Sequence, residues 1–225
     1  MTQFDEVQAW REAHERVCAL VTGVPREATE ERVPACPDWT VRDLLSHVVG
    51  LGADVLDGDE PDDHNEAWTQ AQVDARRDRS VEELVAEWRG LADDLEAWMR
   101  EHGTRPLGDV TIHEQDLRSA LGVPGARDSA AFAAVRDRMV GRFASRVEGL
   151  PTIALVGESW TWTSDGGPAD ASTVVVTASD FDLGRALMSR RTADQLRSWT
   201  ARGDIEQHLA AFEVLGSLPE APLPE

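Results

Sequence analysis

Apolar side chains recur at helical spacing along the first two thirds of the chain. The spacing predicts amphipathic helices over residues 4–21, 40–52, 80–102, 107–121 and 129–147. Stretches that contain glycine, proline or runs of polar residues separate these helices and predict the loops between them. Several amphipathic helices joined by loops are typical of an up-down bundle.

Two of the predicted helices carry clear start signals. Thr40 and Ser80 are each followed three residues later by an acidic residue, the pattern of a capping box. Gly50 and Gly52 lie further along the first of these helices and are expected to weaken its end. The helix that begins after Ser80 is expected to end at His102-Gly103.

The pattern changes near Gly149. Short runs with strand composition cover residues 152–156, 159–163 and 172–177, and helical patterns return over 180–189, 192–200 and 204–215. We therefore expect a helical bundle over residues 1–148 and a small α/β domain over 149–225. The predicted fold class is α+β, mainly α.

The charge balance limits the possible partners. The 225 residues carry 42 acidic against 22 basic side chains, for a formal net charge of −20. Such a surface repels nucleic acid and anionic membranes. No apolar run of membrane-spanning length and no signal peptide is visible, and two cysteines without a CxxC pattern fit a reducing compartment, so we expect a cytoplasmic protein. The absence of Lys and Tyr suggests a GC-rich, actinobacterial genome.

Two helices carry residues that could bind a metal. His47 borders the apolar stripe of its predicted helix, and Asp109 and His113, four residues apart, share a face of another. Two histidines and a carboxylate are sufficient ligands for a catalytic divalent ion. The same spacing is also common in helices that bind no metal, so the pattern alone leaves both interpretations open.

Three segments resemble one protein family. The stretch from Ala35 to His47, ACPDWTVRDLLSH, resembles the first ligand helix of the mycothiol-dependent maleylpyruvate isomerase family, which belongs to the DinB-like metal-binding bundles. Residues 107–122 are similar to the second ligand helix of that family. Residues 178–191 resemble a helix of its C-terminal domain. The segments occur in the expected order over nearly the whole chain.

The resemblance implies a bound metal, usually zinc, held by His47, Asp109 and His113. This chain has Asp109 where the isomerases carry Glu, and the shorter side chain could change the preferred metal. Asp116 is a competing carboxylate on the same face. We interpret it as a residue that orients a histidine ring, although it could itself be a ligand.

The resemblance also bears on two further residues. Arg190 falls at a Gly-Arg position of the family, with Ser189 in place of the glycine, and could bind a carboxylate of the substrate or of the thiol. The alternative is an ordinary arginine at a helix end. Cys36 could be read as a nucleophile, but a small buried residue is the preferred interpretation.

The resemblance implies an enzyme in which a metal stabilises the thiolate of mycothiol, which then attacks a small electrophile. Our hypothesis is a metal-dependent and thiol-dependent isomerase or S-transferase. One alternative is a non-catalytic metal-binding or ligand-binding module, which a fourth protein ligand on the metal would favour. The other is a hydrolase that activates water, which thiol-independent cleavage of esters or amides would favour.

Overall fold

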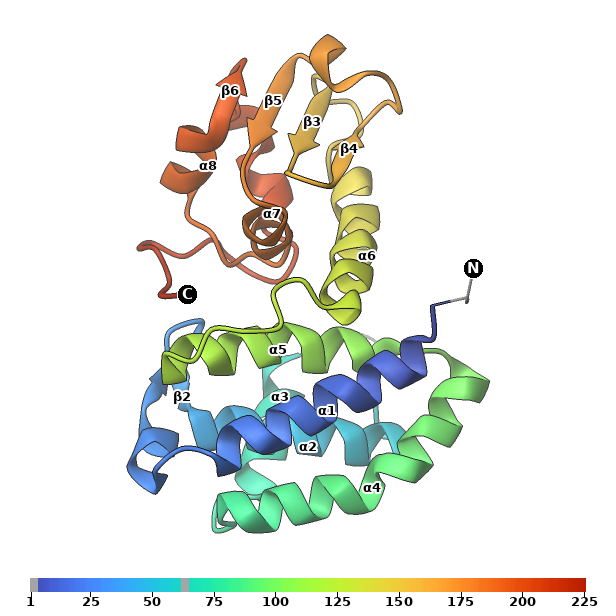
Figure 1. The fold of residues 1–225 in the computed structure, drawn as a ribbon, viewed down its shortest axis with the longest axis vertical. Helices are drawn as coiled ribbons and strands as arrows, with labels where there is room; N and C mark the ends of the chain where they lie inside the picture. The colour runs from blue at the N-terminus through green and yellow to red at the C-terminus, as the bar shows by residue number, and fades with distance from the viewer. Residues whose placement is uncertain (1–3, 62–64) are drawn as a thin grey trace. The chain divides into compact units, whose positions relative to one another are not determined.

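The computed structural model describes residues 4–61 and 65–225, and the chain forms two compact units (Figure 1). Unit 1 extends to Ala126 and includes Pro224–Glu225, and unit 2 comprises Arg127–Leu223. Helices dominate, and small sheets complete the structure. The predicted fold class, α+β and mainly α, is therefore confirmed.

Unit 1 is a bundle of amphipathic helices. The structure bounds these as α1 (Glu6–Thr22), α2 (Val41–Asp57), α3 (Glu66–Ala75), α4 (Val81–His102) and α5 (Arg105–Leu121). Helix α2 packs against α3, α4 and α5, and α1 packs against α4 and α5 (blue to green in Figure 1). Apolar side chains of α1, α2, α4 and α5 bury themselves between the helices, so α2 and α5 are held side by side.

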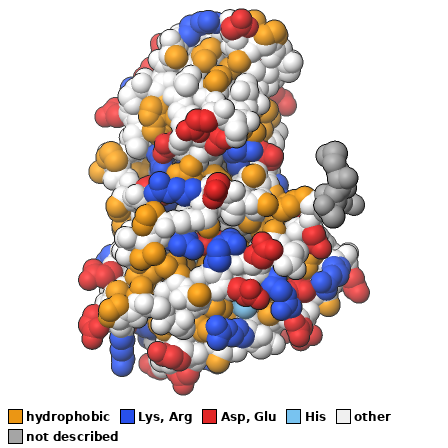
Figure 2. Space-filling model, in the orientation of Figure 1, with side chains coloured by type: hydrophobic (Ala, Val, Ile, Leu, Met, Phe, Trp, Pro, Cys, Tyr) orange, Lys and Arg blue, Asp and Glu red, His pale blue; other side chains and the backbone are white. Residues whose placement is uncertain are grey.

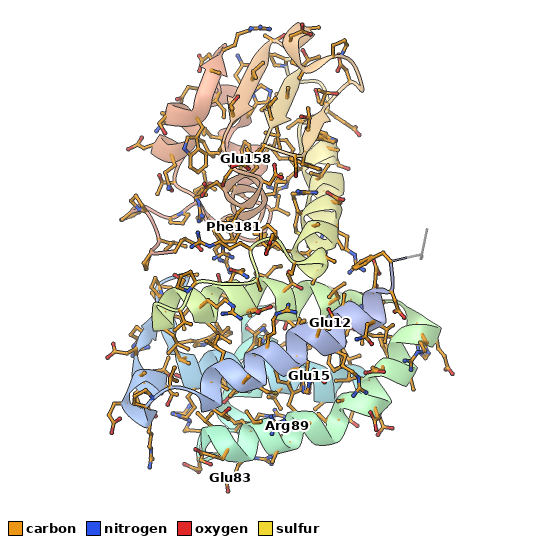
Figure 3. All side chains as sticks on the ribbon, in the orientation of Figure 1. Glu12, Glu15, Glu83, Arg89, Glu158 and Phe181 are labelled. Carbon is orange, nitrogen blue, oxygen red and sulfur yellow. The ribbon has the colours of Figure 1, made fainter. Side chains whose placement is uncertain are left out.

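The predicted helix starts are confirmed. Thr40 accepts a hydrogen bond from the backbone N–H of Asp43, whose side chain accepts one from the backbone of Thr40. Ser80 and Glu83 form the same reciprocal pair at the start of α4, where Figure 3 labels Glu83. Each box satisfies backbone donors that the first turn of a helix leaves without partners.

Three features of unit 1 differ from the sequence-based expectation. Helix α2 continues through both glycines to Asp57, because burial against its neighbours outweighs their low helix propensity. The stretch predicted as a plain connector holds a short 3-10 helix, Arg26–Glu30, and an antiparallel pair, β1 (Arg32–Val33) and β2 (Cys36–Thr40). Helix α3 was not predicted.

Unit 2 builds a four-stranded sheet with helices packed on it. Its helices and strands are α6 (Ala130–Arg146), β3 (Ile153–Val156), β4 (Thr161–Thr163), β5 (Val174–Thr177), α7 (Asp180–Leu187), α8 (Ala193–Trp199) and β6 (Thr200–Arg202), with 3-10 helices at Ala169–Ala171 and Glu206–Phe212. The strand order is β4-β3-β5-β6, and the β3–β5 pair is parallel, whereas the others are antiparallel. Helix α6 packs on α7, and α8 packs on β5 and β6.

Side chains from a loop and from α6 contact the first residues of α7. Glu158, labelled in Figure 3, accepts a hydrogen bond from the backbone N–H of Asp180. The neighbouring Phe181 ring, also labelled, contacts Phe132 of α6 at a centroid distance of 5.1 Å. These contacts join the α6–α7 pair to the loop after β3.

The two units divide the chain differently from the predicted boundary at residue 148. The division falls after Ala126, so α6 belongs to unit 2 and not to the bundle. The physical reason is the apolar face of α6, which packs on α7: Phe132, for example, lies against Gly184, where a side chain would not fit. An amphipathic stripe predicts a helix but not the partner that covers it.

The surface carries charges of both signs. Figure 2 shows Asp and Glu side chains interspersed with Arg on the visible face. Among the helices of the described residues, none has the length and apolar character needed to cross a membrane.

Candidate metal centre

Three of the predicted ligands lie together inside unit 1. Helix α2 supplies His47, and α5 supplies Asp109 and His113 one turn apart. The Nε2 atoms of the two histidines lie 3.4 and 3.5 Å from the same Oδ1 of Asp109. The side chain of His47 is 5% exposed, that of Asp109 16% and that of His113 13%, so the cluster is largely shielded from solvent but still accessible.

These separations fit a shared metal ion. Zinc binds histidine nitrogen and carboxylate oxygen at about 2.0–2.1 Å, and tetrahedral geometry at that bond length puts two ligand atoms about 3.4 Å apart. A direct N–H···O hydrogen bond is shorter, at about 2.9–3.0 Å. The arrangement therefore matches ligands around an ion better than it matches a hydrogen-bonded triad.

The outer nitrogens of both rings are engaged elsewhere. His47 Nδ1 lies 2.6 Å from Oε1 of Gln72, and His113 Nδ1 lies 3.1 Å from Oδ2 of Asp116. Both partners are acceptors, so each Nδ1 carries the proton and donates it. The lone pairs of both neutral rings are then on Nε2, which faces Asp109. Holding a ligand histidine through its outer N–H is usual in metal sites.

The electrostatics of the cluster favour positive charge. Burial lowers the pKa of His47 and is the largest single influence, but the negative charge of the nearby Asp109 carboxylate and the hydrogen bond to Gln72 help to raise that pKa above its ordinary value. A cation placed between the rings would satisfy the same electrostatic demand.

Asp116 and Cys36 lie beside the cluster. One potential ligand atom from each of Cys36, His113 and Asp116 lies within 4.8 Å of the others. Asp116 is completely buried and faces the outer nitrogen of His113, the position of an orienting residue. Among residues 4–61 and 65–225, no fourth His, Cys, Asp or Glu joins His47, Asp109 and His113 in one group. The set of three leaves room for a further ligand.

Arg190 lies in unit 2 and is nearly buried, at 8% exposed. One of its guanidinium nitrogens donates to the carbonyl oxygen of Met188 at 3.0 Å. The preceding Ser189 has a φ of 58°, in the left-handed region that glycine adopts at least cost. This backbone conformation explains why glycine suits that position. Ser189 offsets the cost by donating to the Phe212 carbonyl and accepting from the Leu215 amide.

The sequence did not indicate the residues that support His47. Gln72 lies on α3, the helix that was not predicted, and is 2% exposed. Its Nε2 donates to Oδ2 of Asp54 at 2.6 Å. The Trp39 ring also packs against His47, with ring centroids 5.1 Å apart.

Fold and site together define a helical-bundle protein with a candidate two-histidine, one-carboxylate metal cluster. Consistent with this, the family model described as mycothiol maleylpyruvate isomerase N-terminal domain matches residues 10–127, slightly more than half of the chain. The chain belongs to this family. The match ends within one residue of the end of the continuous part of unit 1. No curated protein and no solved structure matches the chain significantly.

Proposed function

We propose that this protein is a metal-dependent isomerase or S-transferase that uses a low-molecular-weight thiol, mycothiol, on a small electrophile. The observation that carries the proposal is the convergence of His47 Nε2, His113 Nε2 and Asp109 Oδ1. Membership of the mycothiol maleylpyruvate isomerase family supports the choice of thiol and of reaction.

The charges of the ligand set suit thiol activation. His47 and His113 would bind as neutral donors and Asp109 would contribute one negative charge, so a divalent ion held there, zinc in our proposal, keeps one net positive charge. When bound, such an ion lowers the pKa of a thiol and stabilises the thiolate. The thiol can then add to an electrophilic double bond and leave again after rotation, with no net change in the thiol.

The protein's own residues hold the donors ready. Gln72 and Asp116 keep the protons on the outer nitrogens, so that both Nε2 lone pairs stay directed at the site. The largely buried position excludes bulk water, which strengthens the electrostatic effect of the Asp109 charge. In unit 2, we further propose that Arg190 binds an anionic group of the substrate or thiol.

The proposal is tested first by metal content. We expect about one divalent ion per chain in the wild-type protein, as for other sites of this type, and its loss in His47→Gln and Asp109→Asn. The control is His102→Ala, because His102 is an exposed histidine at the end of α4. Wild-type protein that binds no zinc, manganese, nickel or iron after reconstitution would overturn the proposal.

Thiol chemistry is tested on the loaded protein. Thiol added to metal-loaded protein should release protons, and the same addition to Asp109→Asn should not. Conversion of a small cis-unsaturated acid should then require the thiol. Turnover of esters or amides at the same rate with and without thiol would favour the hydrolase instead.

A further inference from the structure

A chain of two hydrogen bonds leads from His47 along α2 to Asp54. His47 Nδ1 contacts Gln72 Oε1 at 2.6 Å, and Gln72 Nε2 contacts Asp54 Oδ2 at 2.6 Å. Asp54 lies two turns beyond His47 on α2, and Gln72 bridges the two from α3. Gln72 is 2% exposed, so its amide has little access to water as an alternative partner.

The direction of each hydrogen bond follows from the carboxylate. An ionised carboxylate only accepts hydrogen bonds, so the Gln72 group that faces Asp54 must be the NH2. The amide oxygen of Gln72 must then face His47, and an amide oxygen also only accepts. His47 Nδ1 must therefore carry a proton, and in the neutral ring the lone pair is then on Nε2, the atom that faces Asp109.

We propose that Asp54 and Gln72 are positioning residues that lock His47 in the tautomer able to bind a metal. This inference rests on the proposed function, in which His47 is a ligand. Asp54 acts only through Gln72, since it fixes the orientation of the amide. Without Asp54, the amide can turn its NH2 to His47, which favours the lone pair on Nδ1 and a proton on the metal-facing nitrogen.

The two histidines are therefore fixed in different ways. Asp116 holds His113 directly, by a completely buried carboxylate. For His47, the Asp54 carboxylate does not contact the ring. The neutral amide of Gln72 lies between them and transmits the effect of the carboxylate. The second arrangement keeps an additional negative charge out of contact with the His47 ring while fixing the same tautomer.

We call the hydrogen-bonded chain His47–Gln72–Asp54 the relay. Moving its carboxylate from position 54 to position 72 tests it. Asp54→Asn removes the constraint, and Gln72→Met removes the acceptor without changing the charge, so both should weaken zinc binding. Loss of such supporting contacts typically costs about 10–100-fold in metal affinity. In the double variant Asp54→Asn/Gln72→Glu, the carboxylate at position 72 accepts from both neighbours, and the affinity should recover. Competition with a chromophoric chelator measures each dissociation constant.

A second readout does not depend on metal. Nitrogen-15 NMR of the metal-free protein, at alkaline pH where the ring is neutral, reports which nitrogen of His47 carries the proton. We expect Nδ1–H in the wild type and in the double variant, and a substantial Nε2–H population in Asp54→Asn. Asp57→Asn is the matched control, because it removes the same charge from an exposed position three residues along α2. Thermal melts confirm that each variant is folded.

The outcomes separate the relay from the proposed function. An Asp54→Asn protein that binds zinc as tightly as Asp57→Asn and keeps Nδ1–H would overturn the relay, even if the wild type binds metal. A wild type that binds no metal would overturn the proposed function, while the NMR comparison would still decide whether Asp54 and Gln72 set the tautomer.

Discussion

Gly50 and Gln72 approach so closely that no side chain fits between them. A Cβ built on Gly50 would lie 2.5 Å from the Cβ and 2.8 Å from the Cγ of Gln72. The absence of a side chain at position 50 thus lets α3 approach α2. This approach brings the Gln72 amide within hydrogen-bonding distance of His47.

Gly50→Ala should therefore lower both the stability of the protein and the affinity of the candidate site for metal. Alanine normally stabilises a helix interior by about 1 kcal/mol relative to glycine. Here the new methyl group would push α3 away and lengthen the contact between Gln72 and His47, so we expect a lower free energy of unfolding and weaker zinc binding. Gly90→Ala in α4 is the control, because nothing lies within 4 Å of its Cβ position. A stabilised Gly50→Ala protein with unchanged zinc affinity would contradict this account.

Cobalt spectroscopy can identify the source of any sulfur on the metal. Cobalt-loaded wild type should lack a thiolate-to-cobalt charge-transfer band, because the proposed ligands offer only nitrogen and oxygen, and added thiol should produce the band. Cys36→Ser should behave identically. A band that is present before thiol is added and lost in Cys36→Ser would make Cys36 a ligand and support a closed, non-catalytic site.

His14 should make the protein sensitive to acid. It stacks on Trp10 and meets the edge of Trp88, and burial, together with the charges of Arg89 and Arg11, lowers its pKa from 6.5 to about 4 (Arg89 is labelled in Figure 3). The unfolded chain binds this proton more readily than the folded one does. Stability from His14 is therefore complete above about pH 6.5 and falls between pH 6.5 and 4, by about 3 kcal/mol.

Denaturant unfolding at pH 7 and pH 4.5 measures this effect. His14→Phe keeps a ring between the tryptophans but cannot take up the proton. Its free energy of unfolding should rise relative to the wild type as the pH falls. A constant difference at both pH values would show that His14 does not cause the acid sensitivity.

Arg190→Ala should raise the KM for an anionic electrophile and leave that for a neutral one nearly unchanged. The reason is loss of the charged hydrogen bonds that a guanidinium gives to a carboxylate. Arg197→Ala is the control, since Arg197 pairs with Asp194 and Glu206 on the surface of α8. Equal KM values for wild type and Arg190→Ala would remove Arg190 from the substrate site.

The sequence predicted the metal cluster better than its support. Helical spacing and motif order single out His47, Asp109 and His113, and the structure places their side chains together; that they bind a metal stays a prediction. Gln72 could not be found in this way, because it contacts His47 across 25 positions of sequence and lies on a helix with a weak pattern, in which only Gln72 and Val73 are buried. Gly50 was misjudged for a related reason: helix propensity describes an isolated helix, whereas close packing decides whether glycine is needed.

The strands and boundaries show the same limit. Residues 36–40 contain Pro37 and an alternation too short to indicate a strand, yet β2 forms because β1 pairs with it. Helix α6 was recognised from its stripe, but nothing local to the stripe specifies that α7 covers it. Elements defined by their own pattern were predictable, and elements defined by their partners were not.

The contact between Trp39 and His47 gives the protein an intrinsic optical reporter. With ring centroids 5.1 Å apart, the indole contacts the imidazole that would hold the ion in our proposal. A paramagnetic ion such as cobalt should quench its fluorescence, and diamagnetic zinc should not. Subtracting the emission of Trp39→Phe from that of the wild type isolates this signal from the other seven tryptophans. Occupancy of the cluster could then be followed during the reaction without an added label.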